Sequence, residues 1–225
     1  MHISRLSPPR ALLVAFGTAI ILCSHDCHAD ACPKEGSAPT GFQRVAPLQK
    51  AILLSDVEAV RRILQDTDVN QRDDWGNTPL VAALTPMERF EPSGITSPEQ
   101  NRRLIANESA ARRTIVSLLL DRGAAVNLPG LLGATPLMQV ARWGEGDDAD
   151  RLLASRLLQL GAEVNARDDF GSTALMYAAQ SGKRELAALL LAHGADRTVT
   201  NCQGETAASL ASYFHHPDIA MLLAR

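Results

Sequence analysis

The side chains of this 225-residue chain that could do chemistry are three pairs of adjacent aspartates and a few histidines. The aspartate pairs are Asp73-Asp74, Asp147-Asp148 and Asp168-Asp169. Two of them precede a glycine in a turn-like sequence, where aspartate is a favoured turn former. A calcium loop would instead need oxygen ligands that alternate over about twelve residues, and none of the pairs offers them. The aspartates therefore predict turns.

Histidine offers no better site. His193 comes just before a glycine that we expect to end a helix. A partial positive charge on its imidazole would be stabilised there by the carbonyl groups at the end of the helix, which is a structural role. His215-His216 lies in a predicted turn with no further ligand at a suitable spacing. There is no G-x-S-x-G motif, no phosphate loop and no paired Cys/His nucleophile. We predict no catalytic activity, cofactor or metal. The alternative, a metal-binding or hydrolytic protein, would use these histidines or Asp147-Asp148 with Asp150.

The composition excludes several classes of protein. The chain is 46% hydrophobic and 21% charged, with a formal net charge of −3. It is therefore too apolar for an intrinsically disordered chain. It also lacks the basic excess that nucleic-acid binding usually requires. Aromatic residues make up only 4%, so the core must be built from Leu, Ala, Val and Ile, which suits closely packed helices.

The first 31 residues have the three parts of a secretory signal peptide. Arg5 and Arg10 precede a 13-residue apolar run (11–23), and Ala29-Asp30-Ala31 follows as an A-x-A cleavage site. The run is shorter than the roughly 20 residues that span a bilayer, which disfavours the alternative of a retained anchor. We therefore predict a signal peptide (1–31), a flexible leader (32–46) and a periplasmic mature protein, with secretion as the alternative. Cys32 and Cys202 would remain after cleavage and are not expected to pair within the chain.

Two motifs alternate along the rest of the chain. The first is a glycine followed by Thr and an Ala-rich stretch, and it occurs at 76–80, 133–137, 171–175 and 204–208. The second is a Leu-Leu pair followed by Gly-Ala, and it occurs at 119–127, 157–165 and 190–196. Such self-similarity at a fixed period indicates a repeat architecture.

These motifs resemble the ankyrin repeat, which has a period of about 33 residues and the signature T-P-L-H-x-A. The resemblance implies an all-α solenoid of about five helix-turn-helix units with short finger turns, covering residues 47–225. At the signature histidine this chain has Val81, Met138, Met176 and Ser209. In the family that histidine ties adjacent units together, so we expect apolar packing to carry more of the stability here.

Local sequence signals support the same elements. The Thr of each first motif can cap a helix, and a following Pro fits the first helical turn. Gly123, Gly161 and Gly194 are predicted to end the outer helices as left-handed caps. Near the start of the array, Ser55 with Glu58 predicts a capping box for the second helix.

The spacing of the finger glycines locates two insertions. Gly171 and Gly204 are 33 residues apart, Gly133 and Gly171 are 38 apart, and Gly76 and Gly133 are 57 apart. The larger surplus falls at about 85–112, between an inner and an outer helix. No Gly or Pro interrupts 99–122, which predicts an outer helix of about 24 residues that protrudes from the stack. Its exposed half would carry arginines at 102, 103, 112 and 113.

The residues that look suited to contact another protein lie at the finger turns and at the ends of the inner helices. Trp, Tyr and Arg dominate interface energies, and this aromatic-poor chain places several of them there. The alternative is that these side chains only form a rim of the core, since scattered surface apolar residues are normal. The candidate protein-binding residues are Asp74, Trp75, Asn77, Leu131, Leu132, Arg142, Trp143, Asp169, Phe170, Gln203 and Tyr213.

The sequence thus predicts a non-catalytic module that binds another protein through its concave face. We expect a monomer that binds neither nucleic acid nor, after signal cleavage, membrane. Exported proteins that resemble it fall into two types: immunity-type inhibitors of toxic effectors, and accessory proteins that support a periplasmic enzyme such as a catalase in peroxide resistance. We favour the first because a protruding insertion suits the blocking of an active site.

Overall fold

The computed structural model describes residues 47–85, 98–144 and 148–224, with residues 98–108 described by their backbone alone. The helices of this range form five consecutive pairs, which we call units 1 to 5. They are α1 (Pro47–Leu53) with α2 (Val57–Ile63), α3 (Pro79–Leu84) with α4 (Pro98–Asp121), α5 (Pro136–Trp143) with α6 (Asp148–Gln159), α7 (Ala174–Gln180) with α8 (Arg184–Ala192), and α9 (Ala207–Tyr213) with α10 (Pro217–Leu223). The predicted all-α stack of about five helix pairs is confirmed. The predicted signal peptide and leader (1–46) lie outside the described residues.

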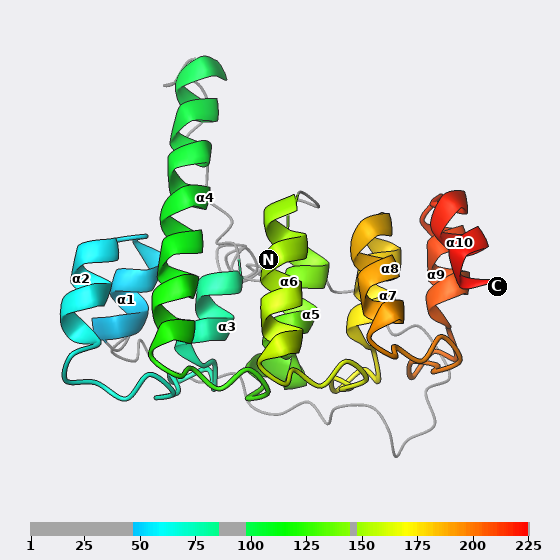
Figure 1. Cartoon of the computed structure of the whole chain (residues 1–225), viewed down its shortest axis with the longest axis horizontal. Coiled ribbons are helices and arrows are strands. Elements are labelled where there is room, and N and C mark those ends of the chain that lie inside the picture. Colours follow the sequence, from blue (N-terminus) through cyan, green and yellow to red (C-terminus); the bar gives the residue numbers. More distant parts are fainter. Residues whose placement is uncertain (1–46, 86–97, 145–147, 225) are drawn as a thin grey trace, which may run out of the picture.

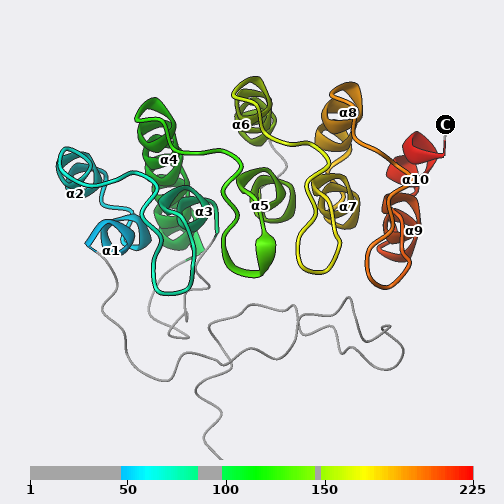
Figure 2. The ribbon, with the colours of Figure 1, turned by 90° about the horizontal axis from the view of Figure 1, so that it is seen from below.

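The helices form two layers in a single row of units (Figures 1 and 2). The odd-numbered helices make the inner layer, and the even-numbered helices make the outer layer. The loops that join consecutive units all lie at the same end of the stack and project beyond the inner helices as fingers. The chain therefore repeats one short-range pattern, as expected of a solenoid in which each unit contacts its neighbours.

Threonine caps start the inner helices of units 2 to 5, as predicted. The hydroxyl oxygens of Thr78, Thr135, Thr173 and Thr206 each accept the backbone N–H three residues later. The prediction for α2 is wrong, because its cap is Asp56, which accepts the N–H of Ala59 at 2.9 Å. Ser55 adopts a φ of 54° in the turn between α1 and α2, so it ends the first helix and cannot cap the second.

The outer helices of units 2 to 4 end at left-handed glycines, again as predicted. Gly123, Gly161 and Gly194 have φ values of 80°, 87° and 86°. At such a φ a side chain would be strained, which is why glycine is favoured at these ends. The turn sends the chain into the finger of the next unit.

The core runs as one continuous cluster through all five units. Small residues allow the inner helices to approach one another, and Ala141, Ala178 and Ala211 are fully buried. Leu157 of α6 and Leu190 of α8 occupy the same position of consecutive repeats and are also fully buried. Burial of this repeated apolar face between neighbours supplies the stability that one helix pair lacks.

Asparagine side chains fasten the units to each other at the ends of the outer helices. Asn127 donates to the carbonyl of Gly161 at 2.8 Å and accepts the N–H of Glu163 at 2.9 Å. Asn165 repeats this pair of bonds one unit later, to Gly194 and Asp196. Each side chain satisfies backbone groups that the end of a helix leaves without an internal partner.

The insertion forms the long helix that the sequence predicts. α4 spans 24 residues and extends well beyond the other outer helices at the end of the stack opposite the fingers (Figure 1). Arg113 is exposed and Arg112 is half-buried, while Arg102 and Arg103 lie where side chains are not described. Within the described residues, no helix is long and apolar enough to cross a membrane.

Candidate protein-binding surface

The fingers are built around an acidic or amide side chain that holds the turn. In unit 4, Oδ1 of Asp168 accepts the N–H groups of Phe170 at 3.0 Å and Ser172 at 2.8 Å. Asp73 does the same in the finger of unit 2, and Asn201 does it in the finger of unit 5. The prediction that Asp73 and Asp168 are turn formers is therefore confirmed.

Hydrogen bonds join successive fingers into one row. The N–H of Asp169 donates to the carbonyl of Leu132 at 3.1 Å, and the N–H of Cys202 donates to the carbonyl of Phe170 at 2.9 Å. Between the fingers of units 2 and 3, the N–H of Leu131 donates instead to the side-chain oxygen of Asn77 at 2.9 Å. Asn77 thus has a structural bond within the surface where the sequence placed it as a contact residue.

Arginines add a second set of bonds between fingers. Arg72 donates to the carbonyl of Pro129 at 2.6 Å, and Arg167 donates to the carbonyl of Thr200 at 2.8 Å. Each also donates to a carbonyl of its own finger. Because these contacts fix the turns relative to one another, the row of finger tips has a defined shape before any partner binds.

The residue that precedes each finger glycine forms what we call the finger strip: Trp75, Leu132, Phe170 and Gln203. Trp75 is 45% exposed and Leu132 is 43% exposed, whereas Phe170 is half-buried. Leu132 has a φ of 58°, an unusual conformation for a leucine. The strip is therefore accessible, and its apolar side chains are not absorbed into the core. Asp74 and Asp169 flank it and are exposed.

A second group of candidate residues lies at the opposite ends of the inner helices. The guanidinium of Arg142 lies 4.8 Å from the ring centroid of Trp143 and 5.3 Å from that of Tyr177. Such cation–π contacts hold the arginine over the two rings. Tyr213, at the end of α9, is 73% exposed and meets Phe214 edge to face. The structure therefore divides the predicted contact residues between the finger end and the other end of the stack.

The comparison with known protein families agrees with this geometry. Residues 149–225 match the family model described as ankyrin repeats (3 copies). Residues 149–225 are ankyrin repeats. No curated protein matches it. Ankyrin repeats are protein–protein interaction modules, and typical ones are not catalytic.

The histidine position of the repeats in this ankyrin-repeat protein is used in two ways. Val81, Met138 and Met176 are each 1% exposed and contribute packing. Met138 and Ser209 also accept a hydrogen bond from the N–H of the capping threonine, so they complete capping boxes. In α5 and α9, the residue at the family's histidine position therefore forms a capping hydrogen bond within its own helix.

Beneath the finger of unit 4 is a buried polar pair that the sequence analysis missed. The hydroxyl of Tyr177 donates to Oδ2 of Asp168, and both residues are buried. Burial is the main cause that raises the pKa of Asp168 and that of Tyr177. Asp168 and Tyr177 are nine residues apart in the sequence. The sequence analysis recognised Asp168 as a turn former, but no pattern indicated that Tyr177 would bind it.

Lys183 is a second buried polar group that the sequence analysis missed. Its ammonium donates to the carbonyl of Val140 at 2.9 Å, at the end of the neighbouring inner helix. Burial lowers the pKa of Lys183 to about 8, and the nearby charge of Asp150 acts in the opposite direction. Ser181 donates to the carbonyl of Arg142 at 3.2 Å, so the turn between α7 and α8 caps the end of the inner helix of unit 3.

The residues considered for metal binding do not assemble in the part of the chain that the structure describes. There, no group of three or more His, Cys, Asp or Glu side chains could hold a metal ion. His193 follows α8, and the ring of His216 lies against Gly182. Asp147 lies outside the described residues. Cys202 is half-buried and forms no disulfide within the described residues.

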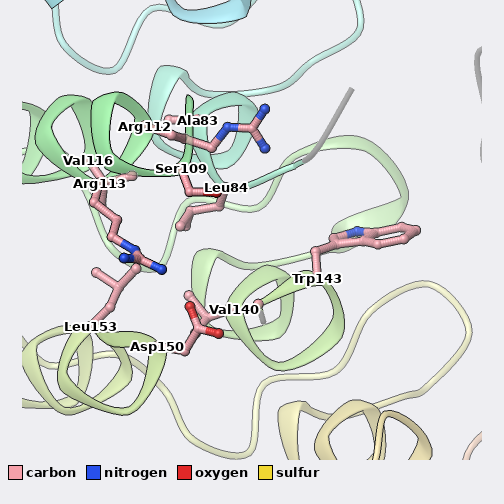
Figure 3. A pocket seen from close by; sticks show the side chains of 11 residues that line it. Ala83, Leu84, Ser109, Arg112, Arg113, Val116, Val140, Trp143, Asp150 and Leu153 are labelled. Atoms are coloured by element: carbon pink, nitrogen blue, oxygen red, sulfur yellow. The ribbon is translucent and has the colours of Figure 1, made fainter. Parts of the chain in front are cut away.

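One pocket lies away from the fingers, between units 2 and 3 (Figure 3). It takes side chains from α3, α4, α5 and α6, among them the candidate residue Trp143. Arg112, Arg113 and Asp150 also line it. The sequence analysis named these charged residues for other roles, because nothing in their spacing shows that α4 and α6 face each other.

Proposed function

We propose that this ankyrin-repeat protein is exported through its N-terminal signal sequence and acts in the periplasm as a non-catalytic inhibitor that binds another protein. The observation that carries the proposal is the finger strip, where Trp75 and Leu132 keep nearly half of their surface exposed on a hydrogen-bonded row of turns. Exposed apolar residues in a contiguous arrangement usually mark an interaction site.

The pre-formed geometry of the row supports a docking role. Bonds from Arg72, Arg167 and Asn77 hold adjacent fingers together. Because the fingers are already ordered, they lose little conformational entropy when a partner binds, which favours affinity. Large apolar side chains such as Trp75 act as anchors, while the flanking Asp74 and Asp169 provide polar contacts at the rim.

An inhibitor role, with the partner a toxic effector, rests on the shape of unit 2. α4 extends beyond the stack at the end opposite the fingers, so it offers a separate projection that can enter the cleft of an enzyme. The accessory role, in which the partner is an enzyme that the protein supports, uses the same surface and has no separate observation in its favour.

The test is affinity capture from cells of the source organism with the full chain carrying a C-terminal tag. The triple variant Trp75→Ala, Leu132→Ala, Phe170→Ala is expected to lose the partner that the native protein captures. A matched control replaces three other exposed apolar residues, Leu54, Leu152 and Met221, with alanine. It should retain the partner.

Equal capture by both variants would show that the finger strip is not the binding surface. Recovery of the tagged protein from the cytoplasmic fraction, with residues 1–31 still attached, would contradict export. The activity of the captured partner, measured with and without the ankyrin-repeat protein, then separates an inhibitor from an accessory protein.

A further inference from the structure

The outer helices of units 2 and 3 are joined by an ion pair near the fingers and make little other contact. Near the fingers, Arg156 of α6 forms an ion pair with Asp121 of α4 at 2.6 Å. Toward the opposite end α4 and α6 make little contact, whereas α2 and α4, and α6 and α8, pack against each other. This separation leaves the pocket over α3 and α5.

The pocket has an apolar floor of a definite size. Its floor and walls are formed by Leu84, Val116, Val140 and Leu153, one from each of the four helices. Its volume is about 90 Å³. An apolar cavity of about 150 Å³ takes a benzene ring, and a water molecule occupies about 30 Å³ of the liquid. The pocket therefore suits a branched aliphatic side chain better than an aromatic ring.

The rim of the pocket carries more positive than negative charge. Arg112 and Arg113 contribute two guanidinium groups, and Asp150 is the only carboxylate among the described lining residues. In Figure 3, Arg113 and Asp150 point toward one another across the opening. Arg112 lies beside Ala83, and its guanidinium points away from Asp150. The ammonium of Lys183 adds positive charge beneath Val140. Over 98–113 the sequence holds four arginines and two glutamates, so the protruding helix has the same sign.

We propose that this pocket, lined by Leu84, Arg112, Arg113, Val140, Trp143 and Leu153, binds an acidic segment of a partner protein by taking an aliphatic side chain that has carboxylates beside it. The aliphatic group fills the floor, and the carboxylates meet the arginines at the rim. Guanidinium groups suit this task because their planar donors match a carboxylate in a bidentate manner.

This site is separate from the finger strip and does not depend on it. A phosphate-rich polymer would use the arginines but not the apolar floor, so the combination favours a peptide. The chain as a whole has a net charge of −3, which gives no long-range attraction for nucleic acid. An acidic peptide therefore fits the local chemistry best.

The two tryptophans of the chain allow a direct test, because Trp143 borders the pocket and Trp75 belongs to the finger strip. The full chain is labelled with 5-fluorotryptophan, and its two fluorine NMR lines are assigned with Trp75→Phe and Trp143→Phe. The probe is the peptide Gly-Ser-Glu-Leu-Glu-Ser-Gly. Titration is expected to move the Trp143 line to saturation and leave the Trp75 line in place.

Three comparisons decide the chemistry. Replacing the glutamates of the peptide with lysine, or its leucine with alanine, should abolish or strongly weaken the shift. The protein variant Arg112→Gln, Arg113→Gln should bind at least about tenfold more weakly, since the loss of a single charge-assisted hydrogen bond already costs about that factor. A matched control, Arg61→Gln, Arg62→Gln, removes the adjacent exposed arginines of α2 and should bind as the native chain does.

Several outcomes would overturn the proposal. These are an unmoved Trp143 line, equal shifts with the lysine peptide, or equal weakening by the α2 control. A comparable shift with inorganic phosphate alone would indicate an anion site without the aliphatic component. A concentration-dependent Trp143 line with dimers in sedimentation would assign the pocket to a second copy. Movement of the Trp75 line alone would refute the pocket but support the finger strip, so the two proposals fail independently.

Discussion

The junction between units 2 and 3 and the junction between units 3 and 4 are made from the same repeat but pack differently. In units 2 to 5 the same position of the inner helix is held by Ala83, Val140, Ala178 and Ala211, all of them buried. Between units 3 and 4 both the inner helices and the outer helices pack against each other, whereas between units 2 and 3 the outer helices make little contact and leave the pocket. A β-branched valine stands at the looser junction, and both insertions enter at the same end of the stack. The junction whose two units contain insertions is thus less closely packed than the junction that follows it.

The largest expected effect compares two leucines one turn apart on α6. Leu157 is fully buried near the end of the junction between units 2 and 3 where Arg156 pairs with Asp121. Leu153 is half-buried beside the pocket. Leu157→Ala should lower the free energy of unfolding by about 3 kcal/mol, while Leu153→Ala should cost clearly less because the site is already partly open. Urea unfolding followed by circular dichroism measures both. Equal losses would mean that the two ends of the junction are equally well packed.

A medium effect compares equivalent alanines in the two junctions. Ala178→Leu forces a larger side chain between closely packed helices and should cost about 2 kcal/mol of unfolding free energy. Ala83→Leu places the same atoms beside an existing space, so it should cost less than half as much. Thermal unfolding of both variants provides the measurement. A larger loss for Ala83→Leu would contradict the difference in packing.

The smallest effect, at most about 1.4 kcal/mol of unfolding free energy per pH unit, concerns Lys183 at the junction between units 3 and 4. Its pKa is about 8 in the folded chain, against an ordinary value of 10.5, because burial disfavours the ammonium. Above pH 8 the unfolded chain holds one proton more than the folded chain at this group, so its contribution to stability rises with pH up to about 10.5. The difference in unfolding free energy between the native chain and Lys183→Met should therefore shift in favour of the native chain over this range. A pH-independent difference would show that the ammonium is solvated.

Much of the fold could be predicted from the sequence because each local signal is short-range. The finger glycines, the capping threonines and the uninterrupted run of α4 specify elements without reference to the rest of the chain. The prediction for α2 was wrong because it scored Ser55 as a cap. That residue takes a left-handed conformation in the turn, and Asp56 caps the helix instead.

The candidate sites were less predictable because they depend on which residues come together across units. The finger strip follows from the repeat register, so Trp75 and Leu132 could be named in advance. The pocket brings together residues as distant as Leu84 and Leu153, and their proximity depends on the separation of α4 from α6. The two insertions and the valine at position 140, where units 2, 4 and 5 have alanine, were the sequence signals of that looser junction.

The length of α4 means that a small change in its tilt at the pocket would move its far end by several ångströms. The helix forms one wall of the pocket and continues far past the tops of its neighbours. Its 24 residues make a rod about 36 Å long, so a tilt of about 10° at the base would swing the tip by about 6 Å. A small adjustment where the rod is seated is thus amplified into a displacement larger than a side chain at its far end.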